Sequence, residues 1–221
     1  CIRDRPNSNV AGFDIYRSSP FFENCLFSMN SGGQLGGAIY AYSSSSPSFL
    51  DCTFEQNTAN YGGALRLASS FSQFQSCVFD QNFASQQGGG AYVDNSSPRY
   101  LNCEFSSNAA ASGGGMYART GSQIEIGGFV PEDMVDFISN SASFGGGVYL
   151  EPQTSANFFT SRFFFNSADS SGGGIYSDRS GAIVFLSEFV GNVSGTDGGG
   201  GITVTDGGSE LTVEFSSFCS N

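Results

Sequence analysis

The cysteines are the residues of this sequence whose spacing most directly suggests chemistry. Four of the six recur at intervals of 27, 25 and 26 residues, at Cys25, Cys52, Cys77 and Cys103. If these positions stack in successive coils about 4.8 Å apart, the pairs Cys25–Cys52 and Cys77–Cys103 fall within disulfide range. The same column could instead pack as buried thiols. A linear column in a chain without His is a poor zinc site, so we expect no metal there.

Acidic and basic side chains offer a second kind of chemistry. Glu132, Asp133 and Asp136 could gather a Ca²⁺ ion, or could form an acidic solvated loop. Elimination or hydrolysis of a polysaccharide would need clustered acids beside a base, or paired carboxylates across a cleft. The arginines are instead scattered along the chain, at Arg66, Arg99, Arg119, Arg162 and Arg179. Catalysis is therefore unsupported, and we expect no cofactor.

The composition excludes several functional classes. The 221 residues include no His, and all eight basic residues are Arg. Histidine bases, hydrolase triads, Schiff-base lysines and P-loop lysines are therefore absent. Twenty acidic residues bring the net charge to −12, which excludes a basic nucleic-acid reader. No segment approaches the roughly 18 consecutive apolar residues of a membrane-spanning helix.

A repeat of about 26 residues organises the whole chain. A Phe-x-x-Asn motif occurs eight times, and each of the first seven copies is followed by a Gly-Gly element. The Asn positions are Asn30, Asn57, Asn82, Asn108, Asn140, Asn166, Asn192 and Asn221. The Gly-Gly elements begin at Gly36, Gly62, Gly88, Gly113, Gly145, Gly172 and Gly199, so the spacings are 26, 26, 25, 32, 27 and 27. The long spacing places an insertion within residues 121–135.

Each repeat contains three short strand-like runs, which in the second coil are residues 37–41, 48–50 and 52–54. Three strands per repeat predict an all-β fold, a parallel β-helix solenoid of about eight coils of roughly 26 residues each. We expect a single domain over residues 1–221, with a degenerate first coil at 1–21 in which Asn7 or Asn9 replaces the ladder Asn. Regular coils follow at 22–221. A start at Cys1 suggests a segment of a longer protein.

Alternation along the strands predicts which side chains fill the interior. One column is formed by the motif phenylalanines: Phe27, Phe54, Phe79, Phe105, Phe137, Phe163, Phe189 and Phe218. A second column, three positions before the Cys column, contains Phe22, Phe49, Phe74, Tyr100, Phe158, Val184 and Val213, with Glu132 as its interruption. We expect each Asn to adopt left-handed backbone at a turn and to bond the Asn one coil away. The paired glycines should supply positive φ.

These alternating motifs resemble the repeats of chlamydial polymorphic outer membrane proteins. The resemblance rests on Gly36-Gly37-Ala38-Ile39 with Phe27-Ser28-Met29-Asn30, and on the later copies over residues 22–221. It implies a right-handed, pectin-lyase-like β-helix displayed on a cell surface, often in an adhesive region. The later coils depart from the family pattern, because they carry Gly-Gly-Gly and lose the Cys column after Cys103.

An outer column follows the apolar positions of the Gly-Gly strands. Its members are Tyr40, Arg66, Tyr92, Tyr117, Tyr149, Tyr176 and Thr203. The aromatic rings could bind sugars or another chain, or could simply support one another between coils. Two glycosylation sequons also occur; we expect Asn192 to be buried and, if the source organism glycosylates the protein, Asn95 in its polar loop to be the acceptor.

Two functions from different classes fit these features. The first is a non-catalytic structural or adhesive module at the cell surface or outside the cell, within a fibre or appendage. Its partners would be neighbouring coils or subunits of a larger assembly. The alternative is a carbohydrate-binding or carbohydrate-active β-helix. Absent Lys, the Cys column and a net charge of −12 favour an exported rod over a cytosolic enzyme.

Overall fold

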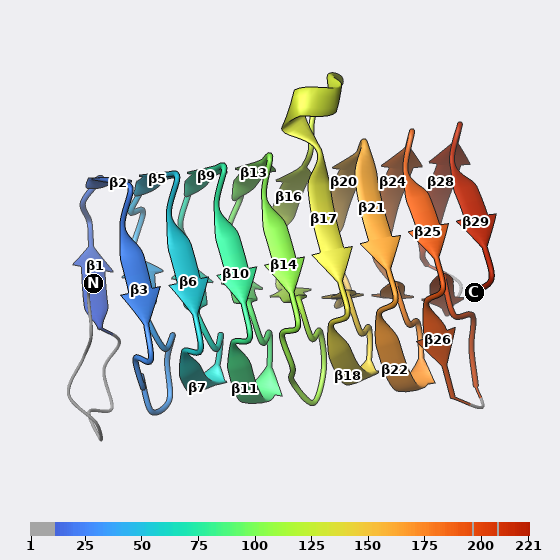
Figure 1. The fold of residues 1–221 in the computed structure, drawn as a ribbon, viewed down its shortest axis with the longest axis horizontal. Coiled ribbons are helices and arrows are strands. Elements are labelled where there is room, and N and C mark those ends of the chain that lie inside the picture. The colour runs from blue at the N-terminus through green and yellow to red at the C-terminus, as the bar shows by residue number, and fades with distance from the viewer. Residues whose placement is uncertain (1–11, 196, 207) are drawn as a thin grey trace.

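The computed structural model describes residues 12–195, 197–206 and 208–221. The predictions for Cys1, Asn7 and Asn9 lie outside this part of the chain. Figure 1 shows a parallel solenoid whose coils succeed one another from the first strand to the last. The only helix among the described residues is a single 3₁₀ turn, η1 (Pro131–Asp133). The all-β parallel solenoid predicted from the repeat is therefore confirmed.

Three sheets of eight parallel strands form the walls of the solenoid. The GG sheet, which follows the Gly pairs, consists of β1 (Phe13–Tyr16), β4 (Ile39–Tyr42), β8 (Leu65–Ala68), β12 (Ala91–Asp94), β15 (Met116–Arg119), β19 (Val148–Leu150), β23 (Ile175–Asp178) and β27 (Ile202–Thr205). The middle sheet consists of β2 (Phe21–Glu23), β5 (Ser48–Leu50), β9 (Gln73–Gln75), β13 (Arg99–Leu101), β16 (Gln123–Ile126), β20 (Ser155–Phe159), β24 (Gly181–Phe185) and β28 (Glu210–Glu214). The FxxN sheet consists of β3 (Leu26–Ser28), β6 (Thr53–Glu55), β10 (Val78–Asp80), β14 (Glu104–Ser106), β17 (Val135–Ile138), β21 (Ser161–Phe164), β25 (Glu188–Val190) and β29 (Ser217–Cys219).

Several coils contain a fourth short strand that the sequence did not predict. These corner strands connect the FxxN sheet to the GG sheet of the next coil. They are β7 (Thr58–Tyr61), β11 (Phe83–Gln87), β18 (Ser141–Phe144), β22 (Ser167–Ser171) and β26 (Val193–Ser194). The segment between each ladder Asn and the next Gly pair therefore forms a side wall of its own.

The interior is a set of stacked aromatic columns. The motif phenylalanines from Phe27 to Phe189 are fully buried, and consecutive rings stack with centroids 4.5 to 4.9 Å apart. The second column meets them edge to face, as Phe49 meets Phe54 at 5.5 Å. Stacked and T-shaped pairs are the favoured aromatic geometries, so repetition of one residue type stabilises the rod along its whole length.

The insertion lies at a different place in the second column than the alignment predicted. Tyr100 is paired with Ile126, and Ile126 with Phe158, so Ile126 fills the interior and Glu132 lies outside the column. The extra residues form a loop between β16 and β17 that carries η1 and projects from the rod (Figure 1). Counting back from Val135 failed because the loop separates two strands that are almost contiguous in the other coils.

The turns use positive φ at other residues than expected. In each coil the residue before the ladder Asn has left-handed backbone, as at Met29 (φ 55) and Gln56 (φ 54). The ladder Asn itself does not. The first glycine of each pair does supply positive φ in six coils, with Gly62 at 71° and Gly113 at 63°. The side chain of the left-handed residue before Asn points outward, which frees the Asn amide to face its neighbours in the wall.

Candidate functional site

The predicted outer column exists as an aligned row on the GG sheet. Tyr40 pairs with Arg66, Arg66 with Tyr92, and Tyr92 with Tyr117. Tyr149 and Tyr176 continue the row, and Tyr117 stacks on Tyr149 at 4.9 Å. These residues are absent from the interior cluster, so the alternation argument placed their side chains on the correct face.

The row is not an open surface. Tyr92 and Tyr117 are only 2% exposed. The corner segments cover part of it: Tyr61 of β7 contacts Tyr92 at 5.5 Å, and Phe144 of β18 contacts Tyr176 at 5.4 Å. The sequence signal for this covering is the aromatic residue that directly precedes some Gly pairs, as in Tyr61-Gly62. Tyr92 and Tyr117 therefore pack within the molecule.

Arg66 lies inside an aromatic cage in this row. Its guanidinium carbon lies 5.0 Å from the Tyr92 ring centroid, 5.6 Å from Tyr40 and 5.7 Å from Tyr61. Cation–π contacts of this kind hold a partly desolvated Arg in place. Arg66 thus connects the coils on either side of it, through Tyr40 and Tyr92, and the corner strand β7, through Tyr61.

A charged network lies along the rim of the same sheet. Arg119 donates to the Tyr92 hydroxyl (3.2 Å) and pairs with Glu151 (3.5 Å) and Asp94 (3.9 Å). Tyr117 donates a short hydrogen bond to Glu151. Burial, followed by this hydrogen bond, raises the pKa of Tyr117. A tyrosine with a raised pKa stays protonated at neutral pH and cannot serve as a general base.

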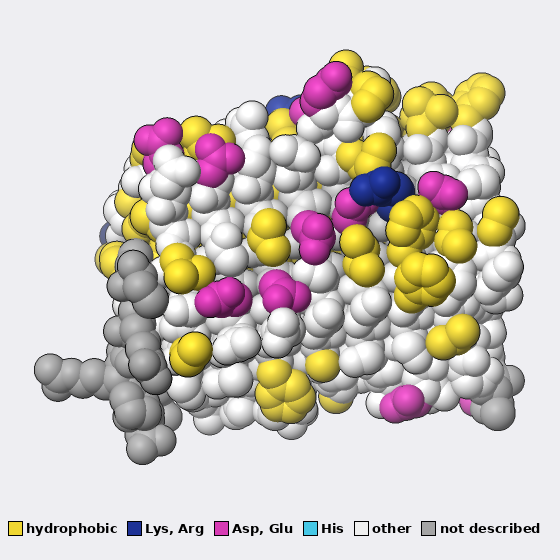
Figure 2. All heavy atoms as spheres, viewed as in Figure 1, with side chains coloured by type: hydrophobic (Ala, Val, Ile, Leu, Met, Phe, Trp, Pro, Cys, Tyr) yellow, Lys and Arg dark blue, Asp and Glu magenta, His cyan; other side chains and the backbone are white. Residues whose placement is uncertain are grey.

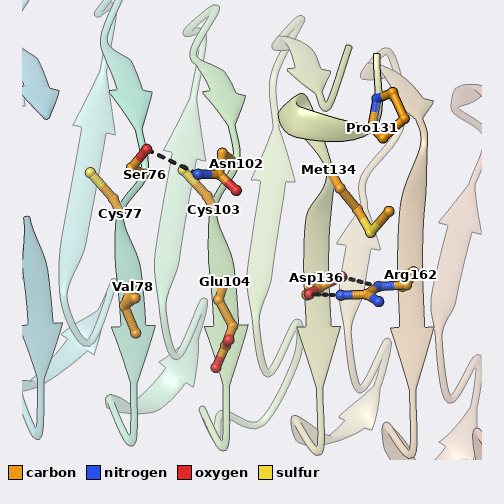
Figure 3. A pocket seen from close by; sticks show the side chains of 10 residues that line it. All are labelled: Ser76, Cys77, Val78, Asn102, Cys103, Glu104, Pro131, Met134, Asp136 and Arg162. Atoms are coloured by element: carbon orange, nitrogen blue, oxygen red, sulfur yellow. Dashed lines mark hydrogen bonds and ion pairs between the residues drawn. The ribbon is translucent and has the colours of Figure 1, made fainter. Parts of the chain in front are cut away.

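An open hollow of about 530 Å³ lies on the outside of the FxxN sheet beside the insertion (Figure 3). It is lined by Ser76, Cys77, Val78, Asn102, Cys103, Glu104, Pro131, Met134, Asp136 and Arg162. Arg162 is engaged there by Asp136, with Nε 2.6 Å from Oδ1 and a second bond from Nη2. This hydrogen bonding raises the pKa of Arg162. A paired, protonated Arg is unsuited to abstract a proton, so Arg162 is not placed to act as the base of an elimination.

The acids of the insertion do not converge. Glu132 and Asp133 lie in η1, whereas Asp136 lies in β17 and binds Arg162. Within residues 12–195, 197–206 and 208–221, no group of three or more Cys, Asp or Glu side chains is arranged to hold a metal ion. The solvated loop and the calcium site both stay predictions.

The cysteine column forms a buried stack of free thiols. Cys25, Cys52, Cys77, Cys103 and Cys219 are unpaired, and Cys52, Cys77 and Cys103 are at most 3% exposed. Each of these three thiols donates to the carbonyl two residues earlier, as Cys77 does to Gln75 at 3.3 Å. Ser161 and Ser187 occupy the same column and make the same bond. Disulfide pairing within the column stays a prediction.

The two sequons differ in accessibility. Asn192 is fully buried in the ladder, whereas Asn95 is exposed at the turn between the GG and middle sheets. Its amide donates to Ser69 at 3.1 Å. Asn95 thus meets the steric condition for modification, and its glycosylation stays a prediction.

Comparison with known proteins adds one finding. The family profile described as "right handed beta helix region" matches residues 4–130, more than half of the chain. No curated protein matches the sequence significantly. Among the described residues, no helix is long and apolar enough to cross a membrane.

Proposed function

Since the chain belongs to the right-handed β-helix family, we propose that it is a non-catalytic structural or adhesive module of an extracellular or cell-surface protein. In this role the repeated coils provide length and rigidity, and contact surfaces recur with the period of the fold. The similarity of its motifs to chlamydial polymorphic outer membrane protein repeats supports a place in a surface fibre or appendage.

The observation that carries the proposal is the in-register stacking of the interior columns from coil to coil. Ala182, Val184 and Phe189 are buried beneath their partners one coil later, Leu211, Val213 and Phe218. A further coil or a second subunit stacked on the last described coil would bury these partners in the same way.

Such a surface favours contact with another protein surface. Unpaired parallel strands are templates for further pairing, and an apolar cross-section gains free energy when it is covered. The natural occupants are further coils or a second subunit of the same assembly, because these would continue the stacked columns. This makes the end of the rod the contact surface we propose.

The composition supports an exported location. An acidic surface keeps a rod soluble, and a Cys column at coil spacing is suited to disulfides in an oxidising compartment. We propose that Cys25 pairs with Cys52 and Cys77 with Cys103 where such oxidation occurs.

Photo-crosslinking tests the end contact. Benzoylphenylalanine replaces Phe218 in one variant and Phe165 in the control; Phe165 is 61% exposed but lies on the side of the rod. We expect covalent oligomers from the substituted position 218 and few from position 165. Equal yields from both positions, or none from position 218, would contradict the proposal.

A further inference from the structure

An exposed aromatic surface lies where the middle sheet turns into the FxxN sheet in the later coils. We call it the aromatic corner and define it as Phe129, Phe159, Phe185, Leu186 and Phe215. Phe129 packs on Phe159 with ring centroids 4.6 Å apart, and Phe185 contacts Phe215 at 5.5 Å. Phe129 also reaches Phe185 at 6.4 Å, so the rings form one continuous group. Figure 2 shows hydrophobic side chains gathered along this edge over the C-terminal coils.

The aromatic corner is far more accessible than the core. Phe129 is 73% exposed, Phe215 is 78% and Leu186 is 49%, whereas Phe159 and Phe185 are half-buried. Two of these residues, Leu186 (φ 50) and Phe215 (φ 50), hold left-handed backbone, a conformation that is unfavourable for bulky side chains. The interior is already filled by the stacked columns, so packing of the core does not account for these residues. Large exposed apolar groups that touch one another mark interaction sites.

The charge around the aromatic corner is negative. Glu132 follows Phe129 on the insertion, Glu214 is in register with Phe185, and Glu188 begins β25 just after Leu186. Glu132 and Glu214 form no ion pair within the described part of the chain. The nearby cation, Arg162, is held by Asp136. A partner that complements this surface is therefore apolar in its centre and positive at its edges.

The geometry of the aromatic corner suits an α-helix. Its side chains come from successive coils, which repeat about every 4.8 Å. An α-helix repeats its i, i+3/i+4, i+7 face every 5.4 Å. Over three or four coils the two periods remain close, so successive apolar helix positions can each meet one level of the corner.

Two other occupants fit less well. A second copy that docked corner to corner would bring its own Glu132, Glu188 and Glu214 against the same acids. A flat sugar ring would need a coplanar aromatic shelf, but the interplanar angles are 39° for Phe129 with Phe159 and 78° for Phe185 with Phe215. These tilted rings instead form ridges between which aliphatic side chains can insert.

We propose that the aromatic corner is a docking site for a cationic amphipathic helix of a partner protein. Its apolar face contacts the Phe and Leu side chains, and its Lys or Arg residues pair with Glu132, Glu188 and Glu214. This inference is separate from the end contact, since it concerns the side of the rod.

The test is a fluorescence-anisotropy titration with a labelled, helical Leu–Lys peptide. A peptide of the same composition in scrambled order controls for net charge, and a Leu–Glu peptide controls for sign. The protein variant is Phe129→Ser with Phe185→Ser. The matched control is Phe83→Ser with Phe165→Ser, which removes two exposed rings outside the corner. Circular dichroism establishes that each variant is folded.

We expect the helical Leu–Lys peptide to bind the wild-type chain and to lose about tenfold in affinity with the corner variant, equivalent to about 1.4 kcal/mol. The matched control should lose less than about twofold. Glu132→Gln with Glu214→Gln should weaken binding at low salt and have little effect at high salt, since screening removes the charge contribution. This charge variant keeps the test decisive even if the loss of Phe185 disturbs folding.

Three results would overturn the proposal. The first is equal binding of the scrambled peptide. The second is equal loss of affinity in the corner variant and the matched control. The third is binding of a neutral oligosaccharide that the corner variant abolishes, because this would identify the corner as a carbohydrate site.

Discussion

Each fully stacked ladder asparagine joins three coils through one side chain. Asn108 donates to the Phe79 carbonyl at 2.8 Å and to Asn140 Oδ1 at 3.0 Å. Its own Oδ1 accepts from the backbone N–H and the amide of Asn82. All these groups are buried, so removing the side chain leaves several donors and acceptors without partners.

We predict that Asn108→Ala lowers the free energy of unfolding by about 3 kcal/mol or more, because each buried unpaired polar group costs about 1–3 kcal/mol. Urea denaturation measures this loss. Asn157→Ala, at a half-exposed position on the middle sheet, is the control and should lose less than about 1 kcal/mol. Similar losses in the two variants would contradict the role given to the ladder.

In the reduced protein, where Cys77 and Cys103 are free thiols, the buried thiols and tyrosines predict a loss of stability at alkaline pH. Hydrogen bonding with Cys103, together with burial, raises the pKa of Cys77 from 9.0 to about 12. Burial, with Asp178 nearby, raises the pKa of Tyr149 from 10.0 to about 12. Below pH 9 both states keep these protons. Between pH 9 and 12 the unfolded state loses them first, so stability falls as the pH rises.

Denaturant midpoints measured from pH 8 to 11 test this expectation. Cys77→Ser should fold, because Ser187 occupies the same column, and it should show a shallower decline than the wild-type chain. A wild-type stability that is constant over this range, or a variant with the same slope, would show that the thiol does not contribute.

At the level of single residues, the sequence predicted which face a side chain points to better than it predicted which residues surround that side chain. Alternation correctly placed Tyr92 outside the core, but it could not reveal the corner strand that covers it, since β7 has no strong strand signal. The ladder bonds of Asn were predictable from repetition. The left-handed residue was not, because the side chains before each Asn are as different as Met29, Gln56 and Phe165.

The second glycine of each pair shows how tightly the coils pack. A Cβ atom added at Gly114 would collide with the Gly146 carbonyl oxygen and lie 2.5 Å from the Ser141 carbonyl oxygen. Both are backbone atoms of the next coil and cannot move without separating the strands. Gly121, in contrast, has φ +68° and no atom within 4 Å of the added Cβ.

We therefore predict different costs for two Gly-to-Ala substitutions. Gly114→Ala should lower the free energy of unfolding by about 3 kcal/mol or prevent folding, since it overpacks the wall. Gly121→Ala should cost only about 1 kcal/mol, the penalty for left-handed backbone. Chemical denaturation of both variants gives the comparison, and equal costs would refute the packing explanation.

At the level of elements, the period predicted the strands and their in-register stacking. The sequence placed the insertion only within residues 121–135. It aligned Glu132 with the interior column, whereas Ile126 fills that position in the structure. The aromatic corner was missed altogether. Its members come from the insertion and from three later coils, and no single segment of sequence brings them together.

For the whole molecule, repetition explains the fold. The first seven coils bury their motif Phe and ladder Asn against neighbouring coils, whereas Phe218 of the last described coil is 46% exposed. The fold was predictable from the eight copies of one motif.

We propose that a further coil or a second subunit stacks on Leu211, Val213 and Phe218 of the last described coil. Sedimentation velocity over a wide range of protein concentrations measures this association, with Val213→Glu and Phe218→Glu as the double variant. Charges on strand edges oppose pairing, and both positions are already exposed, so the variant should fold. The wild-type chain should associate as its concentration rises, and the variant should stay monomeric. A wild-type chain that remains monomeric throughout, or a variant that associates equally, would contradict it.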